Sequence, residues 1–251
     1  MTTAGDIGSR MGALFEPSMT VLVTGGASGI GAGLSRAFAA AGCQVTATGL
    51  TEAELATADS GKGVTLRTLD VRDQAAVERL FAGFDRLDVV VNCAGIAFHQ
   101  REEFDPAVFA RTLDVNLTGT MRVCAAARPL LAQRGGAILT LASMNSFFGA
   151  PGSPGYASSK GGIVQLARSL AIAWARDGIR VNAIAPGGIE TPMTAALRAS
   201  EHASKRALER TPMRRWGKPD DLAGAALFLA SPAADFVTGA VLTVDGGYSI
   251  A

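Results

Sequence analysis

Short runs of apolar residues alternate with longer segments in which apolar residues recur every three or four positions, from about residue 20 onward. The short runs predict buried strands and the longer segments predict the helices that cover them. Residues 89–91 are three consecutive valines, as expected of a strand covered on both faces. The predicted strands comprise residues 20–24, 44–48, 64–69, 87–92, 137–141, 180–184 and 241–244.

This alternation predicts an α/β fold with a single doubly wound parallel sheet of about seven strands and helices on both faces. The chain has 251 residues, of which 48% are hydrophobic. Such a chain buries one large core, so we expect a single domain over residues 19–251. Residues 1–18 contain Asp6, Arg10 and Glu16 and lack an uninterrupted apolar core. They predict a flexible N-terminal extension and not a secretory signal.

Charge and composition argue against several classes of partner. The formal net charge is +1, and the basic residues are scattered along the chain, so we expect no nucleic-acid partner. Apolar stretches such as residues 222–230 fall far short of the ~20 residues that span a bilayer, so we expect a cytoplasmic protein without membrane contact. Cys43, Cys93 and Cys124 lack metal-ligand or redox-pair spacing, as do the two histidines. This predicts reduced thiols and no metal.

Several polar or small residues directly follow predicted strands. They are Gly25, Asp70, Asn92, Ser143 and Pro186. The carboxyl ends of parallel strands meet at one edge of the sheet, where ligands of such folds bind. We therefore expect these residues to line one cleft.

The glycine-rich segment Thr24-Gly-Gly-Ala-Ser-Gly-Ile-Gly31 joins the first strand to a helix predicted at residues 30–41. Gly25 and Gly29 permit a tight turn and close approach to a pyrophosphate, and Gly31 permits close packing of helix and strand. The helix N-terminus offers free N–H groups to the phosphates. The alternative is a glycine-rich turn that binds no ligand.

Tyr156 and Lys160 are four residues apart, which places both on one face of a helix. The ammonium group then stabilises a neighbouring phenolate, whose unperturbed pKa is ~10. This pair predicts an acid–base site, although a Tyr and a Lys at this spacing more often form an amphipathic surface pair.

A set of motifs carries a resemblance to a known family. The motifs are Thr24-Gly-x-x-x-Gly-Ile-Gly31, Asp70-Val71, Asn92-Cys-Ala-Gly95, Asn116, Ser143, Tyr156-x-x-x-Lys160, Pro186-Gly187 with Thr191, and Asp245-Gly246-Gly247. In this order, over residues 20–251, they resemble the short-chain dehydrogenase/reductase family, including its 3-oxoacyl-carrier-protein reductases and small alcohol dehydrogenases. The resemblance implies a Rossmann-like fold and hydride transfer with NAD or NADP.

The resemblance also implies roles for individual residues. Tyr156 is the general acid or base, Lys160 lowers its pKa and binds the nicotinamide ribose, Ser143 orients the substrate oxygen, and Asn116 supports Lys160 through a water. The implied cofactor-binding residues are Gly25, Ser28, Gly29, Ile30, Gly31, Gly49, Asp70, Val71, Asn92, Ala94, Gly95, Tyr156, Lys160, Pro186, Gly187, Ile189 and Thr191.

Each of these positions has an alternative interpretation that involves no ligand. Asp70 and Thr191 are suited to cap a helix, Ser143 to cap a turn, and residues 92–95 to end a strand. Asn116 is a poor helix former, so it predicts a bent helix backbone or a bound water.

The cofactor's 2′ position is where the chain departs from the family pattern. Gly49 stands where an acidic residue would bind the ribose diol, and Ser28 where many phosphate-binding members carry a basic residue. Glu52 and Glu54 add negative charge nearby, which modestly favours NAD. NADP remains open if hydroxyl groups of Thr48 or Thr51 and backbone N–H groups hold its phosphate.

The predicted function is an NAD(P)-dependent oxidoreductase for a small or medium ketone or secondary alcohol. Its apolar pocket is expected to lie under a lid at residues 194–216, with His99 and Arg101 either near the substrate or in an ordinary surface loop. The candidate pocket residues are Phe98, Met144, Phe147 and Phe148. Alternatives are an NADPH-dependent 3-oxoacyl-carrier-protein reductase, a non-catalytic dinucleotide sensor, and an epimerase or dehydratase with bound NAD. By resemblance, residues 241–248 predict subunit contacts in a homotetramer.

Overall fold

The computed structural model describes residues 11, 14–16, 18–58, 61, 63–98 and 101–251. Its centre is a parallel sheet of seven strands in the order β3-β2-β1-β4-β5-β6-β7. The strands are β1 (Thr20–Thr24), β2 (Gln44–Gly49), β3 (Val64–Thr68), β4 (Val89–Asn92), β5 (Gly136–Leu141), β6 (Ile179–Pro186) and β7 (Val241–Val244). The predicted α/β fold with a doubly wound sheet is confirmed.

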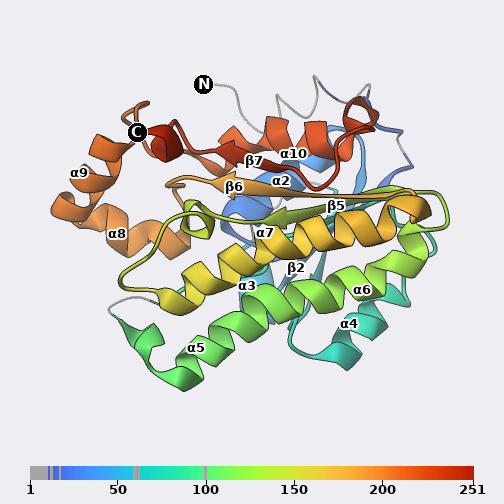
Figure 1. The fold of residues 1–251 in the computed structure, drawn as a ribbon. Helices are drawn as coiled ribbons and strands as arrows, with labels where there is room; N and C mark the ends of the chain where they lie inside the picture. Colours follow the sequence, from blue (N-terminus) through green and yellow to red (C-terminus); the bar gives the residue numbers. More distant parts are fainter. Residues whose placement is uncertain (1–10, 12–13, 17, 59–60, 62, 99–100) are drawn as a thin grey trace.

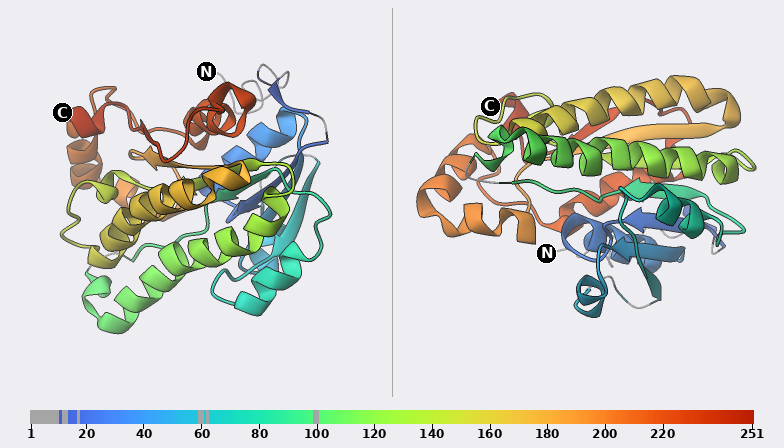
Figure 2. Two further views of the ribbon diagram at one scale, coloured as in Figure 1. Left: turned by 45° about the vertical axis from the view of Figure 1, so that its right-hand side comes forward. Right: turned by 90° about the horizontal axis from the view of Figure 1, so that it is seen from below.

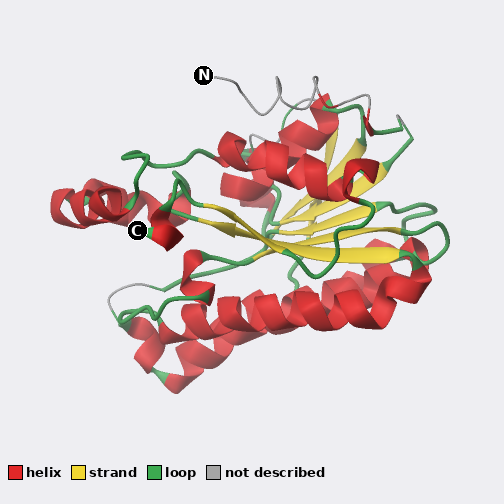
Figure 3. Cartoon of the chain, turned by 45° about the horizontal axis from the view of Figure 1, so that its top comes forward, coloured by secondary structure: helices red, strands yellow, loops and turns green. Residues whose placement is uncertain are grey.

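Helices cover both faces of the sheet (Figures 1 and 3). They are α2 (Gly29–Ala40), α3 (Glu52–Ala56), α4 (Gln74–Phe81), α5 (Pro106–Leu113), α6 (Gly119–Leu131), α7 (Pro154–Trp174), α8 (Ala195–Ala199), α9 (Glu201–Arg210) and α10 (Ala223–Ala230). In Figure 1, α2 and α10 lie on one face, and α4, α5, α6 and α7 lie on the other.

Two apolar cores separate along these faces. Leu34, Phe38 and Leu227 pack with strand residues on the α2 and α10 face. On the opposite face, the core is built around Val123 and Ile163. The strands are apolar in both directions because each face meets a helix layer.

Strand bounds differ slightly from the predicted ones. Residues 87 and 88 were predicted within a strand, but β4 begins at Val89. The carboxylate of Asp88 accepts hydrogen bonds from Thr20 N and from the guanidinium of Arg86, at 2.8 Å each. This side chain therefore links the residue before β4 to the start of β1. β6 is longer than predicted and extends from Ile179 to Pro186.

The described part of the N-terminal extension is attached to the domain. Phe15 is buried, and its ring meets that of Phe38 edge-on at 5.9 Å between centroids. The expectation of a loose extension is therefore wrong at this residue, because an apolar ring covers the α2 face. Residues 1–10, 12, 13 and 17 lie outside the described residues.

The predicted lid region consists of α8 and α9, preceded by the single turn Pro192–Thr194. Figure 2 shows both helices, coloured orange, together at one end of the molecule beside the C-terminus. Neither helix buries a residue fully. Among the described residues, every helix is too short or too polar to traverse a lipid bilayer.

Candidate active site

The glycine turn between β1 and α2 has the shape that the sequence predicts. Gly25 and Gly29 have φ values of +63° and +52°, which side chains rarely adopt. A Cβ at Gly25 would lie 2.7 Å from Ala94 N, and one at Gly31 would overlap the carbonyl oxygen of Gly25. The turn is thus confirmed as a place where only glycine permits the packing of helix and strand.

The N-terminus of α2 fits a phosphate group. Its N-cap residue, Ser28, makes no side-chain capping bond, and the first turn contains no acidic residue. The first N–H groups of a helix lack partners within it and carry partial positive charge. The residues present therefore fit a dinucleotide pyrophosphate at this turn.

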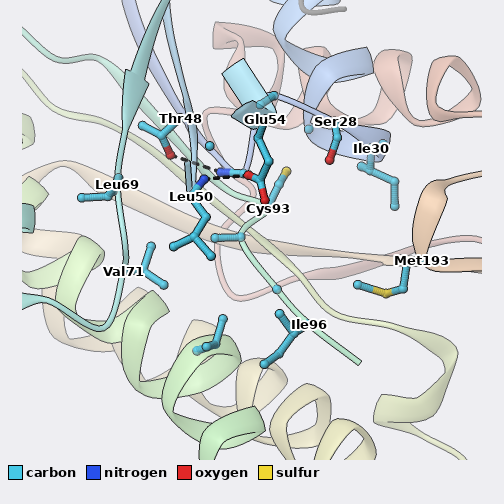
Figure 4. Close-up of a pocket in the computed structure, with 18 of the residues that line it drawn as sticks. Ser28, Ile30, Thr48, Leu50, Glu54, Leu69, Val71, Cys93, Ile96 and Met193 are labelled. Carbon is cyan, nitrogen blue, oxygen red and sulfur yellow. Dashed lines mark hydrogen bonds between the residues drawn. The ribbon is translucent and has the colours of Figure 1, made fainter. Parts of the chain in front are cut away.

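A cleft runs from this turn across the carboxyl ends of β1, β2 and β4, at the point where the strand order reverses (Figure 4). It is lined by eleven of the predicted cofactor residues, namely Gly25, Ser28, Gly29, Ile30, Gly31, Gly49, Asp70, Val71, Ala94, Gly95 and Thr191. Thr191, from the segment after β6, lies against the glycine turn. A Cβ added at Gly29 would be 3.4 Å from Thr191 Cβ. Residues from five separated segments thus meet in one place.

At the distal end of the cleft, Asp70 is paired with Arg72. The guanidinium donates to both carboxylate oxygens, with the shortest distance 2.6 Å to Oδ2, and this bonding lowers the pKa of Asp70. Asp73, not Asp70, is the N-cap of α4, since its Oδ1 accepts from Ala76 N at 3.0 Å. The helix-cap alternative for Asp70 is therefore wrong.

Lys160 lies next to Gly95, which lines the cleft. A Cβ added at Gly95 would be 3.8 Å from Lys160 Nζ. Its ammonium donates to the carbonyl oxygen of Leu141 at 2.6 Å and is 5.6 Å from the ring centroid of Tyr156. Burial lowers the pKa of Lys160 to about 8, partly offset by Cys93. The ammonium is held by the end of β5, beside the cleft.

Tyr156 stands in the first turn of α7, next to Ser143. Burial raises the pKa of Tyr156, the hydrogen bond with Ser143 lowers it, and the charge of Glu103 raises it further. The expectation of a lowered pKa is wrong for the polypeptide alone, because desolvation outweighs the stabilisation of the phenolate. Ser143 also caps the short turn after β5, where its Oγ accepts from Asn145 N at 3.2 Å. The turn-capping interpretation of Ser143 is therefore confirmed, and the same hydroxyl is hydrogen-bonded with Tyr156.

Asn116 lies in a π-helical turn, Asp114–Thr118, between α5 and α6. Its side chain accepts from Ile96 N at 2.8 Å and donates to Ile96 O at 2.9 Å and to Ser159 Oγ at 3.1 Å. The predicted bent backbone is confirmed. The amide connects the segment after β4 to α7, one residue before Lys160.

Comparison with known proteins decides what this arrangement belongs to. A family model described as enoyl-(acyl carrier protein) reductase matches residues 25–249. The galactitol 2-dehydrogenase (L-tagatose-forming) of Cereibacter sphaeroides is 41% identical over 238 residues, covering 91% of this chain and 94% of that protein. The chain belongs to the short-chain dehydrogenase/reductase family.

Two further relatives agree. The cis-4-hydroxycyclohexanecarboxylate dehydrogenase of Sinomonas cyclohexanicum is 40% identical over 251 residues, covering 95% of this chain and 99% of that protein. A gluconate 5-dehydrogenase from Burkholderia cenocepacia, solved in complex with NADP and tartrate, matches with a TM-score of 0.88 and 35% identity, covering 96% of this chain and 99% of that one. This short-chain dehydrogenase/reductase is an oxidoreductase that uses NAD or NADP and acts on alcohol or ketone substrates.

Some predicted residues lie away from the cleft lining. Asn92 is buried, and its side-chain N–H₂ group faces Cys124 Sγ at 3.6 Å. Gly187 and Ile189 line a second hollow, formed with residues 243–247. His99 lies outside the described residues. Among the described residues, no group of three potential metal ligands is close enough to hold an ion.

Two acidic residues shape the site without being predicted to do so. Glu54 was read only as nearby charge, but its carboxylate reaches back into the cleft beside Gly49. No sequence motif indicates Glu103, yet it is 1% exposed and accepts a hydrogen bond from Tyr156 N. Glu54 lies in the first turn of α3 and Glu103 in the short turn before α5. Acidic residues are common at such positions, so neither contact could be found from spacing alone.

Proposed function

We propose that this short-chain dehydrogenase/reductase interconverts a secondary alcohol of a polyol, sugar acid or hydroxylated ring acid and the corresponding ketone. The observation that carries the proposal is the grouping of Ser143, Tyr156 and Lys160 beside a cleft built around the glycine turn. The names of the relatives from Cereibacter, Sinomonas and Burkholderia support this substrate class.

In this proposal, the bound nicotinamide supplies or accepts the hydride. Tyr156 donates a proton to the carbonyl oxygen in reduction and removes the alcohol proton in oxidation. Ser143 orients that oxygen, and its hydrogen bond favours the phenolate. Lys160 binds the nicotinamide ribose from its place beside Gly95. Asn116 bonds both to Ile96, in the segment after β4, and to Ser159 on α7. These bonds hold that segment at a fixed distance from the part of α7 that carries Lys160.

We further propose a preference for NAD. Glu54 Oε2 accepts from Leu50 N at 2.7 Å, and a Cβ on Gly49 would be only 3.2 Å from this oxygen. The Glu54 carboxylate thus lies beside Gly49, the strand-end position at which the family pattern has an acidic residue and this chain has none. A carboxylate there is suited to bind a ribose diol and repels a 2′-phosphate. Two arginines also line the cleft: Arg72 is committed to Asp70, and Arg111 lies over the ring of Phe98.

The proposal extends to the surroundings of the site. We propose that α8 and α9 form the substrate lid and that the enzyme is a homotetramer with β7 near a subunit contact. Cys43, Cys93 and Cys124 are free thiols, which supports work in a reducing compartment such as the cytoplasm. The alternative substrate, an acyl group on a carrier protein, is supported by the description of the matching family model.

Turnover with a defined substrate panel tests the function. The panel contains galactitol, gluconate and cis-4-hydroxycyclohexanecarboxylate with NAD, and an acetoacetyl thioester with NADPH. We expect oxidation of at least one alcohol in the panel. Tyr156→Phe is expected to reduce kcat by at least ~100-fold, as the loss of a general acid or base does, with unchanged NADH affinity in a fluorescence titration.

Ser158→Ala is the matched control, since Ser158 is an exposed residue in the same turns of α7. It should leave kcat unchanged. Turnover of the thioester alone would favour the carrier-protein alternative. Near-normal turnover in the Tyr156→Phe variant would refute the role of Tyr156.

A further inference from the structure

Glu103 is a buried carboxylate that touches the backbone of the residue proposed to transfer the proton. It lies in the short turn Glu102–Phe104 before α5 and is 1% exposed. Its Oε2 accepts from Tyr156 N at 2.8 Å. Its Oε1 accepts from Phe98 N at 3.2 Å and from Thr112 Oγ1 at 3.4 Å. One side chain therefore joins the segment after β4, α5 and the start of α7.

The N-terminus of α7 depends on this contact. The helix begins at Pro154, so the N–H group of Tyr156 belongs to its first turn and has no acceptor within the helix. The N-cap residue, Ser153, does not supply one, since its side chain makes no capping bond and its Oγ donates instead to Phe98 O at 3.0 Å. A carboxylate at the N-terminus of a helix of 21 residues also interacts favourably with the helix dipole.

The packing leaves this carboxylate little freedom. A Cβ at Gly155 would lie 3.2 Å both from Glu103 Oε2 and from Phe109 Cδ2. A buried carboxylate is costly unless its oxygens accept hydrogen bonds, and here they accept from two backbone N–H groups and a hydroxyl. The donors on Tyr156, Phe98 and Thr112 therefore fix the position of the Glu103 carboxylate, and the carboxylate in turn links these three segments.

We propose that Glu103 is the positioning residue of Tyr156, and that it fixes the first turn of α7 against the segment after β4. The phenol reaches Ser143 from that turn, so a shift of its backbone moves the proton-transfer group relative to the substrate oxygen. The inference rests on the proposed role of Tyr156, but its first test requires no turnover.

The charge of Glu103 gives this position a measurable signature. Ser143 after β5 is hydrogen-bonded with the Tyr156 phenol, Lys160 Nζ lies 5.6 Å from its ring centroid, and the charge of Glu103 acts on it from beside the backbone of Tyr156. Burial and the negative charge of Glu103 raise the pKa of Tyr156, against the hydrogen bond from Ser143. Glu103 thus favours the protonated phenol, the form that acts as an acid in ketone reduction. Removing its charge lowers the pH at which Tyr156 ionises.

The first experiment measures tyrosinate formation by ultraviolet absorbance as a function of pH. The chain has two tyrosines, so a Tyr248→Phe background leaves Tyr156 as the only one. In that background, Glu103→Gln is expected to lower the midpoint, because the charge that raises the pKa of Tyr156 is removed. Glu102→Gln removes the same charge from the exposed neighbouring position and is expected to leave the midpoint unchanged. An unchanged midpoint in Glu103→Gln overturns the proposal.

The second experiment keeps the charge and shortens the reach. In Glu103→Asp the carboxylate is one methylene shorter and cannot hold all three donors. We expect kcat, with whichever panel substrate is turned over, to fall about tenfold at unchanged NADH affinity and unchanged tyrosinate midpoint. A wild-type kcat in this variant, measured well below its unfolding temperature, overturns the proposal even if Glu103→Gln fails to fold. If neither the wild type nor any variant turns over a panel substrate, but the midpoint shifts in Glu103→Gln, the proposed substrate class is refuted. The influence of Glu103 on Tyr156 is then still supported.

Discussion

Gly49 and Glu54 lie side by side in the cleft, and the carboxylate that Gly49 lacks is supplied by Glu54. A Cβ at Gly49 would lie 3.0 Å from Ala27 Cβ and 2.9 Å from Leu55 Cδ2, so an aspartate at this strand end would require the neighbours to shift. The carboxylate of Glu54, placed by the N-cap bond from Glu54 N to Thr51 Oγ1 at 3.2 Å, lies in the same region (Figure 4). In the proposed preference for NAD, the discriminating carboxylate therefore comes from α3 and not from the end of β2.

Glu54→Gln is expected to change the cofactor preference. The amide loses the charge that repels a 2′-phosphate and binds the ribose diol more weakly, so the ratio of the NADPH and NADH dissociation constants should move roughly tenfold towards NADPH, which corresponds to ~1.4 kcal/mol. Parallel fluorescence titrations with NADH and NADPH measure both constants. Glu52→Gln, an exposed change of equal charge on the same helix, is the control. Equal shifts in the two variants would mean that general charge, not the Glu54 carboxylate, determines the preference.

At the scale of elements, one arginine links α9, a helix of the proposed lid, to two aromatic rings outside that helix. The guanidinium of Arg210 lies 4.2 Å from the ring centroid of Tyr248 and 4.6 Å from that of Phe148, and it donates to Tyr248 Oη at 3.0 Å. Phe148 follows the turn that carries Ser143, so α9, this turn and the C-terminal segment meet at the side chain of Arg210. α9 buries no residue fully, and a second link is the hydrogen bond that Trp216 Nε1 donates to Ser204 Oγ at 3.0 Å.

Arg210→Ala is expected to loosen the lid and leave the sheet intact. Two cation–π contacts at an accessible site contribute about 1–2 kcal/mol together, so amide hydrogen exchange in α8 and α9 should accelerate roughly 5- to 30-fold. Exchange measured by mass spectrometry, with β4 and β5 as internal references, gives this result directly. Arg206→Ala removes a similar exposed side chain from the same helix and should not change the rate. Unaltered exchange in the Arg210 variant would show that other contacts close the lid.

The sequence predicts those parts of the site that depend on local geometry. The glycine turn, the seven strands and the spacing of Tyr156 and Lys160 are each encoded within a few residues, and the strand ends then bring them together. Glu103 and Tyr156 are 53 positions apart, and their contact depends on how α5 packs against α7. The raised pKa of Tyr156 has the same origin, since desolvation depends on the whole surrounding fold.

At the scale of the whole molecule, apolar groups remain exposed around the β7 side and along α7. Within the described part of the chain, β7 is an edge strand that pairs with β6 alone, and its Leu242 is exposed. Ile172 on α7 is 82% exposed, and Ile250 near the C-terminus is 88% exposed. An exposed sheet edge is commonly covered by another element or chain, and a partner subunit would cover these groups.

Light scattering is expected to give four times the mass of one chain. Ile172→Glu places a charge on the outer face of α7, which a subunit contact there would desolvate, so the particle should dissociate into dimers at micromolar concentration. Gln133→Glu adds the same charge in the exposed segment after α6 and should leave the mass unchanged. A tetramer that survives the Ile172 substitution would move the contact away from α7 and towards β7, whereas a stable wild-type monomer would refute the assembly altogether. Because the glycine turn and Glu103 both belong to one chain, cofactor binding is expected to persist in the dissociated form.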